Sequence, residues 1–451
     1  MKRLLLILFV ILSCFSAVTN SYASEPLNKT FVNVFESEIY DSFLRQLETF
    51  LSEHPMETPD KLYTHLKNGP KGPSAQDKAD FHRKIYLRLR DTLSYRYLID
   101  PESELVRFLD DFTEWLFTGI DLHEISNQFV AKTTQLDPEM MLWTYQLSPD
   151  AFLIYLHDYI CSIPKYGSEK ESDNVGSEDN FADGDIPCRL YKLNNPKQTQ
   201  LLRFSNVARD TLINPFSGKT LLAGLNEEFR NFIESYVSKG KKHLYINQMS
   251  RSKTESVKTE QIENMENDRN TKEGIFVVSL DRDSDSKFYM QTHSFERLNS
   301  AEEFKESFLK ELFKPSGAYY WSKKLNQKEW KQRVKNILNE VHKRYYNNAP
   351  LLLREDRMSF IEIVYVEIVD ALVDILEPDT MNISCKQTVD RGPSLYAFYY
   401  LYQKQKEREL LPQDFVDLMY YVFTPPLAYH DRTTHIYRIT RLQSAINRLG
   451  L

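Results

Sequence analysis

Apolar residues recur at three- and four-residue spacing through much of the first third of the chain. This is the period of one face of an α-helix, and it is clearest at residues 39–51, 81–98, 105–117 and 151–159. Glycine and proline separate these stretches, as at residues 69–73. The pattern predicts an all-helical N-terminal region over residues 24–165.

The pattern changes after Cys188. Residues 243–247 and 275–280 are short, branched and aromatic, which predicts two β-strands around a charged segment. Helical spacing then returns, at 301–312, 327–346 and 359–376. Pro378 ends the last of these stretches, whose apolar character predicts a buried helix.

A strand, a tight loop and a helix are predicted in succession near residue 385. Residues 381–384 form the short strand, and a long helix begins at Ser394 and extends to about residue 410. The fold class expected from these elements is α+β, predominantly helical: a helical N-terminal region is followed by a region with a smaller sheet at 188–451. An acidic Ser/Asn/Gly loop at 166–187 joins the two and is expected to be mobile.

The first 23 residues have the three parts of a secretory signal. Lys2 and Arg3 precede an apolar run at residues 4–12, and small residues at Ser21 and Ala23 suit cleavage. The run is too short to span a bilayer, so export is expected, to the periplasm or beyond the cell, with delivery to a host cell as a further hypothesis. Lipid attachment at Cys14 is the alternative to cleavage after Ala23.

Composition excludes several classes of partner and site. A net charge of −7 with cations scattered among 64 acidic residues disfavours a nucleic-acid partner. The ten histidines show no paired spacing, and the acidic loop lacks the register of a calcium site. Neither a metal nor a cofactor is therefore expected, and no transmembrane segment is predicted in the mature chain.

Three cysteines remain if Cys14 leaves with the signal. Cys161 and Cys188 bracket the acidic loop, and a disulfide between them is an open alternative. Cys385 would then be the odd thiol, directly after the predicted strand.

Cys385 begins a segment whose residue types suit phosphate chemistry. A thiolate attacks phosphorus only if it is ionised, and backbone N–H groups at a helix N-terminus both lower a thiol pKa and bind an oxyanion. Arg391, six positions later, would return across such a loop to hold two phosphoryl oxygens.

This segment resembles the C-x5-R signature of cysteine-dependent phosphatases. Lys386 after the cysteine and Asp390 before the arginine look like the subset that acts on phosphoinositides and inositol phosphates, which includes secreted bacterial effector phosphatases. The resemblance covers about 20 residues. It implies a nucleophile at Cys385 and a phosphate clamp at Arg391. It also implies a second cation at Lys386, an acid or base at Asp390, and a phosphate-binding loop through Gln387, Thr388 and Val389.

Two positions depart from that family. Ser384 stands where phosphotyrosine enzymes often have histidine, and Gly392 stands where the family usually has a serine or threonine that assists release of the thiolate. Three functions stay open: a phosphatase for phosphoinositides or inositol phosphates, a protein tyrosine phosphatase, and a non-catalytic helical interaction protein. In the last, Cys385 is a buried apolar thiol, as free cysteines often are.

Further candidates lie elsewhere in the chain. Asp281, Asp283 and Asp285 follow a predicted strand, where a general acid or only a solvated turn is expected. Near the C-terminus, basic residues (His430, Arg432, His435, Arg438, Arg441 and Arg448) either steer phosphates or form the polar face of a closing helix. The Ser-Gly-Lys-Thr sequence at 217–220 lacks the earlier glycine and preceding strand of a nucleotide loop.

Overall fold

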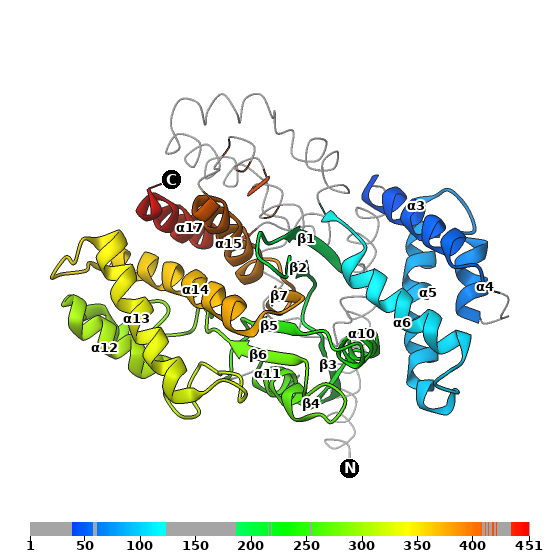
Figure 1. Ribbon diagram of the computed structural model, residues 1–451, viewed down its shortest axis with the longest axis horizontal. Helices are drawn as coiled ribbons and strands as arrows, with labels where there is room; N and C mark the ends of the chain where they lie inside the picture. The colour runs from blue at the N-terminus through cyan, green and yellow to red at the C-terminus, as the bar shows by residue number, and fades with distance from the viewer. Residues whose placement is uncertain are drawn as a thin grey trace, which may run out of the picture.

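A mixed five-stranded sheet lies at the centre of the computed structural model (Figure 1). The structure describes residues 38–56, 61–122, 186–407 and 434–450, with Leu411, Asp414, Asp417, Leu418 and Tyr421, and without Pro215, Gly218, Lys253 and Thr254. The strands are β1 (Cys188–Lys192), β2 (Gln200–Arg203), β5 (His243–Asn247), β6 (Ile275–Ser279) and β7 (Thr380–Ser384). Their order across the sheet is β1-β2-β7-β5-β6.

Strand β7 occupies the middle of the sheet and pairs in parallel with β2 and β5. Strand β6 continues the parallel set beyond β5, whereas β1 is antiparallel to β2 at the opposite edge. All five residues of β5, β6 and β7 are buried, as expected for parallel strands covered on both faces. The carboxyl ends of β7, β5 and β6 therefore lie at one edge of the sheet, where ligands of open parallel sheets bind.

Four helices precede the sheet in the described chain: α3 (Glu38–Glu53), α4 (Lys61–Asn68), α5 (Ala75–Ser94) and α6 (Glu104–Thr118), with a 3-10 turn at Arg96–Leu98. They lie at one end of the molecule in Figure 1. Phe117 of α6 stacks on Phe232 of α10 (Glu227–Ser238), with ring centroids 4.5 Å apart. One continuous hydrophobic core therefore joins these helices to the sheet region.

The remaining described helices are α11 (Ser256–Glu263), α12 (Ala301–Leu312), α13 (Gln327–Tyr346), α14 (Arg354–Leu376), α15 (Arg391–Glu407) and α17 (Ile436–Leu449), with 3-10 turns at Asn264–Asn267 and His293–Arg297. Of these, α11 and α15 pack on the sheet, and α12 and α13 pack with α14. Figure 1 shows α12, α13 and α14 at the end opposite α3–α6. A separate hairpin, β3 (Ala208–Ile213) and β4 (Thr220–Leu225), packs on α11.

Several predicted elements are confirmed. Helices α12 and α13 have the predicted bounds, and the predicted strands at 243–247, 275–280 and 381–384 are β5, β6 and β7. The long predicted helix starts at Arg391 rather than Ser394. Strands β1 to β4 and helices α10 and α11 were not predicted. The observed architecture is thus a mixture of helices with a mainly parallel sheet.

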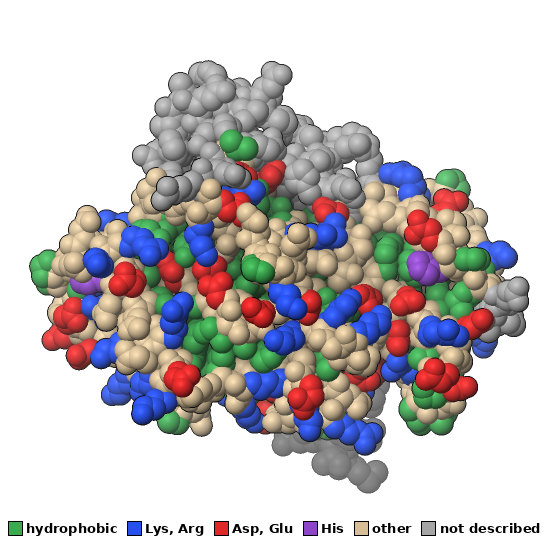
Figure 2. Space-filling view, viewed as in Figure 1, with side chains coloured by type: hydrophobic (Ala, Val, Ile, Leu, Met, Phe, Trp, Pro, Cys, Tyr) green, Lys and Arg blue, Asp and Glu red, His purple; other side chains and the backbone are tan. Residues whose placement is uncertain are grey.

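Other predictions lie outside the described residues. These are the signal peptide with Cys14, the helix at 151–159, Cys161, nearly all of the acidic loop, His430 and Arg432. Cys188 is buried in β1, and its pairing with Cys161 stays a prediction. Among the described helices, none is both long and apolar enough to cross a bilayer. Figure 2 shows acidic and basic side chains interspersed over the described part of one face.

Candidate active site

Three loops meet at the carboxyl edge of the sheet. The first follows β7 and contains Cys385, the second follows β5, and the third follows β6. Backbone hydrogen bonds hold them together: Gln248 N–H donates to the Ser384 carbonyl at 2.8 Å, and Leu280 N–H donates to the Asn247 carbonyl at 2.9 Å. The parallel register of β7, β5 and β6 therefore brings the Cys385 loop to two loops that lie more than 100 residues earlier in the sequence.

The loop after β7 is closed by Thr388. This residue has a positive φ of 51°, which is uncommon for a β-branched side chain. Its hydroxyl accepts a hydrogen bond from Cys385 N–H at 3.3 Å and donates to the Phe204 carbonyl at 2.9 Å. Strain of this kind persists where the surrounding structure holds it, and it clusters at functional sites.

Other carbonyls of the loop are bonded to neighbouring segments. Asn206 N–H donates to the Lys386 carbonyl at 3.3 Å, and the Ser205 hydroxyl donates to the Gln387 carbonyl at 2.8 Å. The hydroxyl of Thr434 donates to the Val389 carbonyl at 3.0 Å. These contacts fix the backbone of the loop from two sides, before α15 begins at Arg391.

Arg391 extends from the first turn of α15 back toward the loop. Its terminal nitrogens donate to both carboxylate oxygens of Glu255, at 2.7 and 3.0 Å, and one of them also donates to the Gln248 carbonyl at 2.9 Å. Burial disfavours the charged guanidinium, but Glu255, Cys385 and Asp283 outweigh this and raise the pKa of Arg391 well above its usual value. Arg391 is therefore a fixed cation, and a negative charge on Cys385 is one of the charges that favour it.

Glu255 is the main residue of the site that the sequence analysis missed. Burial alone would favour its neutral acid, yet Arg391, the Ser250 N–H and Lys386 lower the pKa of Glu255 below its ordinary value. It lies just before α11, in the charged segment between the two predicted strands. Its only sequence signal is an acidic residue eight positions after a predicted strand.

The acidic loop after β6 lies beside the guanidinium. The carboxylate of Asp283 is 3.8 Å from a terminal nitrogen of Arg391, and its side chain is 21% exposed. Asp281 is buried, and burial raises the pKa of its carboxyl to about 6 despite hydrogen bonds from Ser286 and the Asp283 backbone. Asp285 is exposed, and its N–H donates to Asp283 at 2.9 Å. Of the three predicted acids, Asp283 thus lies next to Arg391, and the charge of Arg391 also acts on Asp281.

Asp390 and Lys386 have different surroundings. One carboxylate oxygen of Asp390 accepts a hydrogen bond from His435 N–H at 3.0 Å, so this side chain faces the start of α17. Its role as acid or base stays a prediction. Lys386 is half-buried and close enough to Glu255 to lower the pKa of that carboxyl, which puts a second cation at the site.

Gly392 is required by its surroundings. A Cβ atom here would lie 2.7 Å from Thr388 Cγ2 and 3.1 Å from the Ile383 carbonyl oxygen. The serine or threonine expected from the family therefore does not fit beside Thr388 without a shift. In this chain the hydroxyl within the loop belongs to Thr388.

A buried polar chain supports the strand that leads to Cys385. His243 bonds to Thr380 and to Asn382, each at 2.8 Å, and Asn382 donates to the Ser384 hydroxyl at 2.6 Å. The Ser384 hydroxyl then donates to the Phe204 carbonyl at 2.7 Å. Burial lowers the pKa of His243 to about 4, so it is neutral at pH 7. Ser384, the other departure from the family, thus anchors the loop that carries Thr388.

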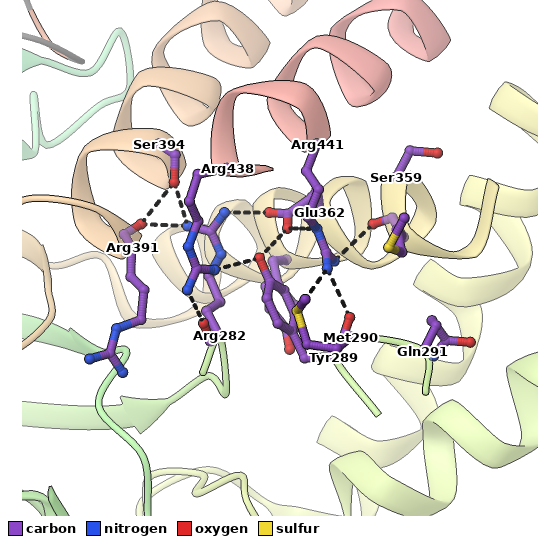
Figure 3. Close-up of polar contacts among 12 residues, drawn as sticks. Arg282, Tyr289, Met290, Gln291, Ser359, Glu362, Arg391, Ser394, Arg438 and Arg441 are labelled. Carbon is purple, nitrogen blue, oxygen red and sulfur yellow. Dashed lines mark hydrogen bonds and ion pairs between the residues drawn. The ribbon is translucent and has the colours of Figure 1, made fainter. Parts of the chain in front are cut away.

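A cluster of buried arginines holds the acidic loop against α14, α15 and α17 (Figure 3). Arg282, between the two aspartates, donates to the Arg391 carbonyl and to Glu362, the latter at 2.6 Å. Arg441 donates to the same carboxylate at 3.0 Å, and Arg438 donates to the Arg282 carbonyl at 2.6 Å. These two C-terminal arginines therefore belong to the core, not to a surface that steers phosphates.

A cavity lies in another part of the described structure, away from the three loops. It has a volume of about 800 Å³ and is lined by residues of α3 and α6 and by Lys239 and Lys241. None of its lining residues comes from the three loops. The candidate site is therefore identified by the hydrogen bonds and charged side chains of the three loops, and not by this cavity. In the described residues no group of three or more histidine, cysteine or acidic side chains is placed to hold a metal ion.

Comparison with family models, curated proteins and solved structures finds no match for this chain. The site is therefore interpreted from its own residues.

Proposed function

We propose that this chain is a cysteine-dependent phosphatase that hydrolyses phosphate monoesters, with phosphoinositides or inositol phosphates as its favoured substrates. The observation that carries the proposal is the position of Arg391. Its guanidinium is held by Glu255, and it begins the helix that follows Cys385 and the central parallel strand β7, so that a charge on Cys385 favours the charged guanidinium. A helix N-terminus and a fixed arginine both favour a bound phosphate.

The chemistry needs two steps. The thiolate of Cys385 attacks phosphorus, the bond to the leaving oxygen breaks, and an acid donates a proton to that oxygen. Water then attacks the cysteinyl-phosphate and gives a proton to the carboxylate left by the first step, the S–P bond breaks, and inorganic phosphate and the thiolate are released. Arg391 would stabilise the charge on the phosphoryl oxygens in both steps.

Asp281 is our choice for the proton donor. A carboxyl whose pKa is about 6 is protonated in a useful fraction near neutral pH, and Asp281 interacts with Arg391. Asp283, which is nearer to solvent, is the alternative. Export through the N-terminal signal is part of the proposal, and it rests on the sequence alone.

The decisive experiment measures phosphate release from a panel of phosphoinositides, soluble inositol phosphates and a phosphotyrosine peptide. The wild type is compared with Cys385→Ser, and Cys188→Ser is the matched control because Cys188 is also a buried cysteine and lies in β1, outside the three loops. We expect Cys385→Ser to abolish release while the control keeps it. If the wild type releases no phosphate from any substrate, or if folded Cys385→Ser is as active as the wild type, the proposal is wrong.

A further inference from the structure

The β3–β4 hairpin begins at the candidate active site. The segment that leads into it, residues 204–207, bonds to the Cys385 loop through Ser205 and Asn206. Because β2 runs parallel to β7, its carboxyl end lies at the same edge of the sheet. The hairpin therefore extends from the edge that carries Cys385.

One side of the hairpin is fixed to α11. Lys258 of α11 forms a buried ion pair with Asp210 of β3 at 3.0 Å, and Thr220 of β4 donates to the same carboxylate at 2.6 Å. Helix α11 directly follows Glu255, which holds Arg391. Two connections therefore link the hairpin to the site: residues 204–207, which lead into β3, and the contact of the hairpin with α11.

The outer part of the hairpin exposes large apolar side chains. Phe216 at the turn is 97% exposed, Leu222 is 57% exposed, and Leu212 and Leu221 are each 49% exposed. Leu212 and Leu222 are cross-strand partners. The Asn214 side chain holds the turn, since it accepts hydrogen bonds from Phe216 N–H at 2.9 Å and Ser217 N–H at 3.2 Å. Apolar side chains held outward in this way typically mark an interaction surface.

The charge of this segment differs from that of the whole chain. Residues 211–222 contain no aspartate or glutamate and one cation, the exposed Lys219, in a chain of net charge −7. An aromatic and aliphatic tip with a lysine beside it fits the boundary between acyl chains and anionic head groups of a bilayer.

We propose that the β3–β4 hairpin docks the protein on an anionic lipid bilayer by inserting Phe216 and its neighbouring leucines into the interface. This inference deepens the proposed function, on which it rests for its substrate: docking would bring the Cys385 loop to phosphorylated lipid head groups. The docking step itself needs no catalysis.

The test is sedimentation of the full chain with vesicles of phosphatidylcholine and phosphatidylserine. It uses the Cys385→Ser background, so that turnover plays no part. Replacing Phe216 and Leu222 together by serine should weaken vesicle binding roughly tenfold or more, because two large side chains no longer leave water. The matched control replaces Tyr97 and Leu98 by serine, which are 79% and 69% exposed in the 3-10 turn Arg96–Leu98.

The expected result is that the control binds as the parent protein does, while the hairpin variant keeps its thermal unfolding temperature and loses binding. Docking through the hairpin is overturned if the parent protein does not sediment with vesicles. It is also overturned if the hairpin variant binds as well as its parent, or if the Tyr97 and Leu98 variant loses binding instead.

Activity separates the two proposals. With Cys385 restored, the hairpin variant should hydrolyse a short-chain, water-soluble phosphoinositide at the wild-type rate and the same lipid in vesicles more slowly. Equal losses on both substrates would overturn the docking role. Vesicle binding without any hydrolysis by the wild type would contradict the phosphatase and leave the docking surface standing.

Discussion

Glu255 holds both terminal nitrogens of Arg391, at 2.7 and 3.0 Å, although 136 residues separate them in the chain. Neither charge would be stable alone at this depth, since an unpaired buried charge is costly. The carboxylate therefore keeps the guanidinium in a single orientation, bonded at the same time to the Gln248 carbonyl of the loop after β5.

Replacing Glu255 by glutamine should reduce kcat/KM for phosphate monoesters roughly tenfold to a hundredfold, the range expected when a hydrogen bond to a charged group is lost. Steady-state kinetics measure the change. Glu260→Gln, on the exposed side of α11, is the control and should behave as the wild type. Unchanged kinetics in folded Glu255→Gln would show that Arg391 needs no such support.

Asp281→Asn should remove one limb of the pH profile. The buried carboxyl has a pKa of about 6 and is needed protonated, so wild-type activity should fall as the pH rises through 6. The asparagine variant should be less active and should lack this fall. Asp283→Asn, measured in the same way, tests the alternative acid. If the fall in activity at high pH disappears in this variant and persists in Asp281→Asn, the proton donor is Asp283.

The same replacement should stabilise the fold above pH 6. The folded pKa of Asp281 is raised, so its stabilising contribution is full below the unfolded pKa and is lost as the pH rises through about 6. At pH 8 the wild type buries an ionised carboxylate, whereas the variant buries a neutral amide at the same position. We expect Asp281→Asn to raise the free energy of unfolding at pH 8 by roughly 2–3 kcal/mol. Urea titrations at pH 5 and pH 8 measure it, with the exposed Asp285→Asn as the control.

Gly392→Ala should destabilise the protein by about 1–3 kcal/mol, as overpacking does. The direction is diagnostic, because glycine to alanine within a helix usually stabilises. Thr388→Ser removes Cγ2, the atom that a Cβ at position 392 would meet at 2.7 Å. The double variant should therefore be less destabilised than the two single effects added together. Strict additivity in urea unfolding would mean that the two residues do not compete for space.

Glu362→Leu should destabilise the fold by roughly 3–5 kcal/mol, because it leaves Arg282 and Arg441 buried without their shared carboxylate. Glu367→Leu, on the same helix, should destabilise the fold less, since its cationic partner Arg344 is exposed and is left in water. Urea unfolding followed by circular dichroism compares the two. If both variants lower the free energy of unfolding by a similar small amount, the contacts of Glu362 with the buried arginines do not stabilise the fold as proposed.

Lys386→Met should slow hydrolysis of multiply phosphorylated lipids more than that of an aryl phosphate. The second cation of the site matters only when the substrate carries a second phosphate. Initial rates on both substrates give the ratio, and the exposed Lys287→Met is the control. An equal loss on both substrates would mean that Lys386 acts on the phosphate group that reacts in both of them, and not on a second phosphate.

Local sequence information accounts for many of the elements that were predicted. Helices α12 and α13 begin after Ser300 and Asn326, whose side chains accept hydrogen bonds from the first-turn N–H groups, so their starts depend on adjacent residues. Strand β2 has four residues and is defined by its register with β7, which no local pattern contains. Helix α11 was missed because it buries polar residues, Lys258 and Thr259 among them, and so lacks an apolar face.

The sequence by itself determined the strand, loop and helix around Cys385, because alternation, turn residues and helical spacing act between near neighbours in the chain. Only the tertiary structure decided which side chains surround the thiol. Strand order at the carboxyl edge brings Glu255, Asp281 and Arg391 together, and pairing across a sheet edge depends on the packing of the whole sheet. Burial then sets the protonation states, which residue type alone does not determine.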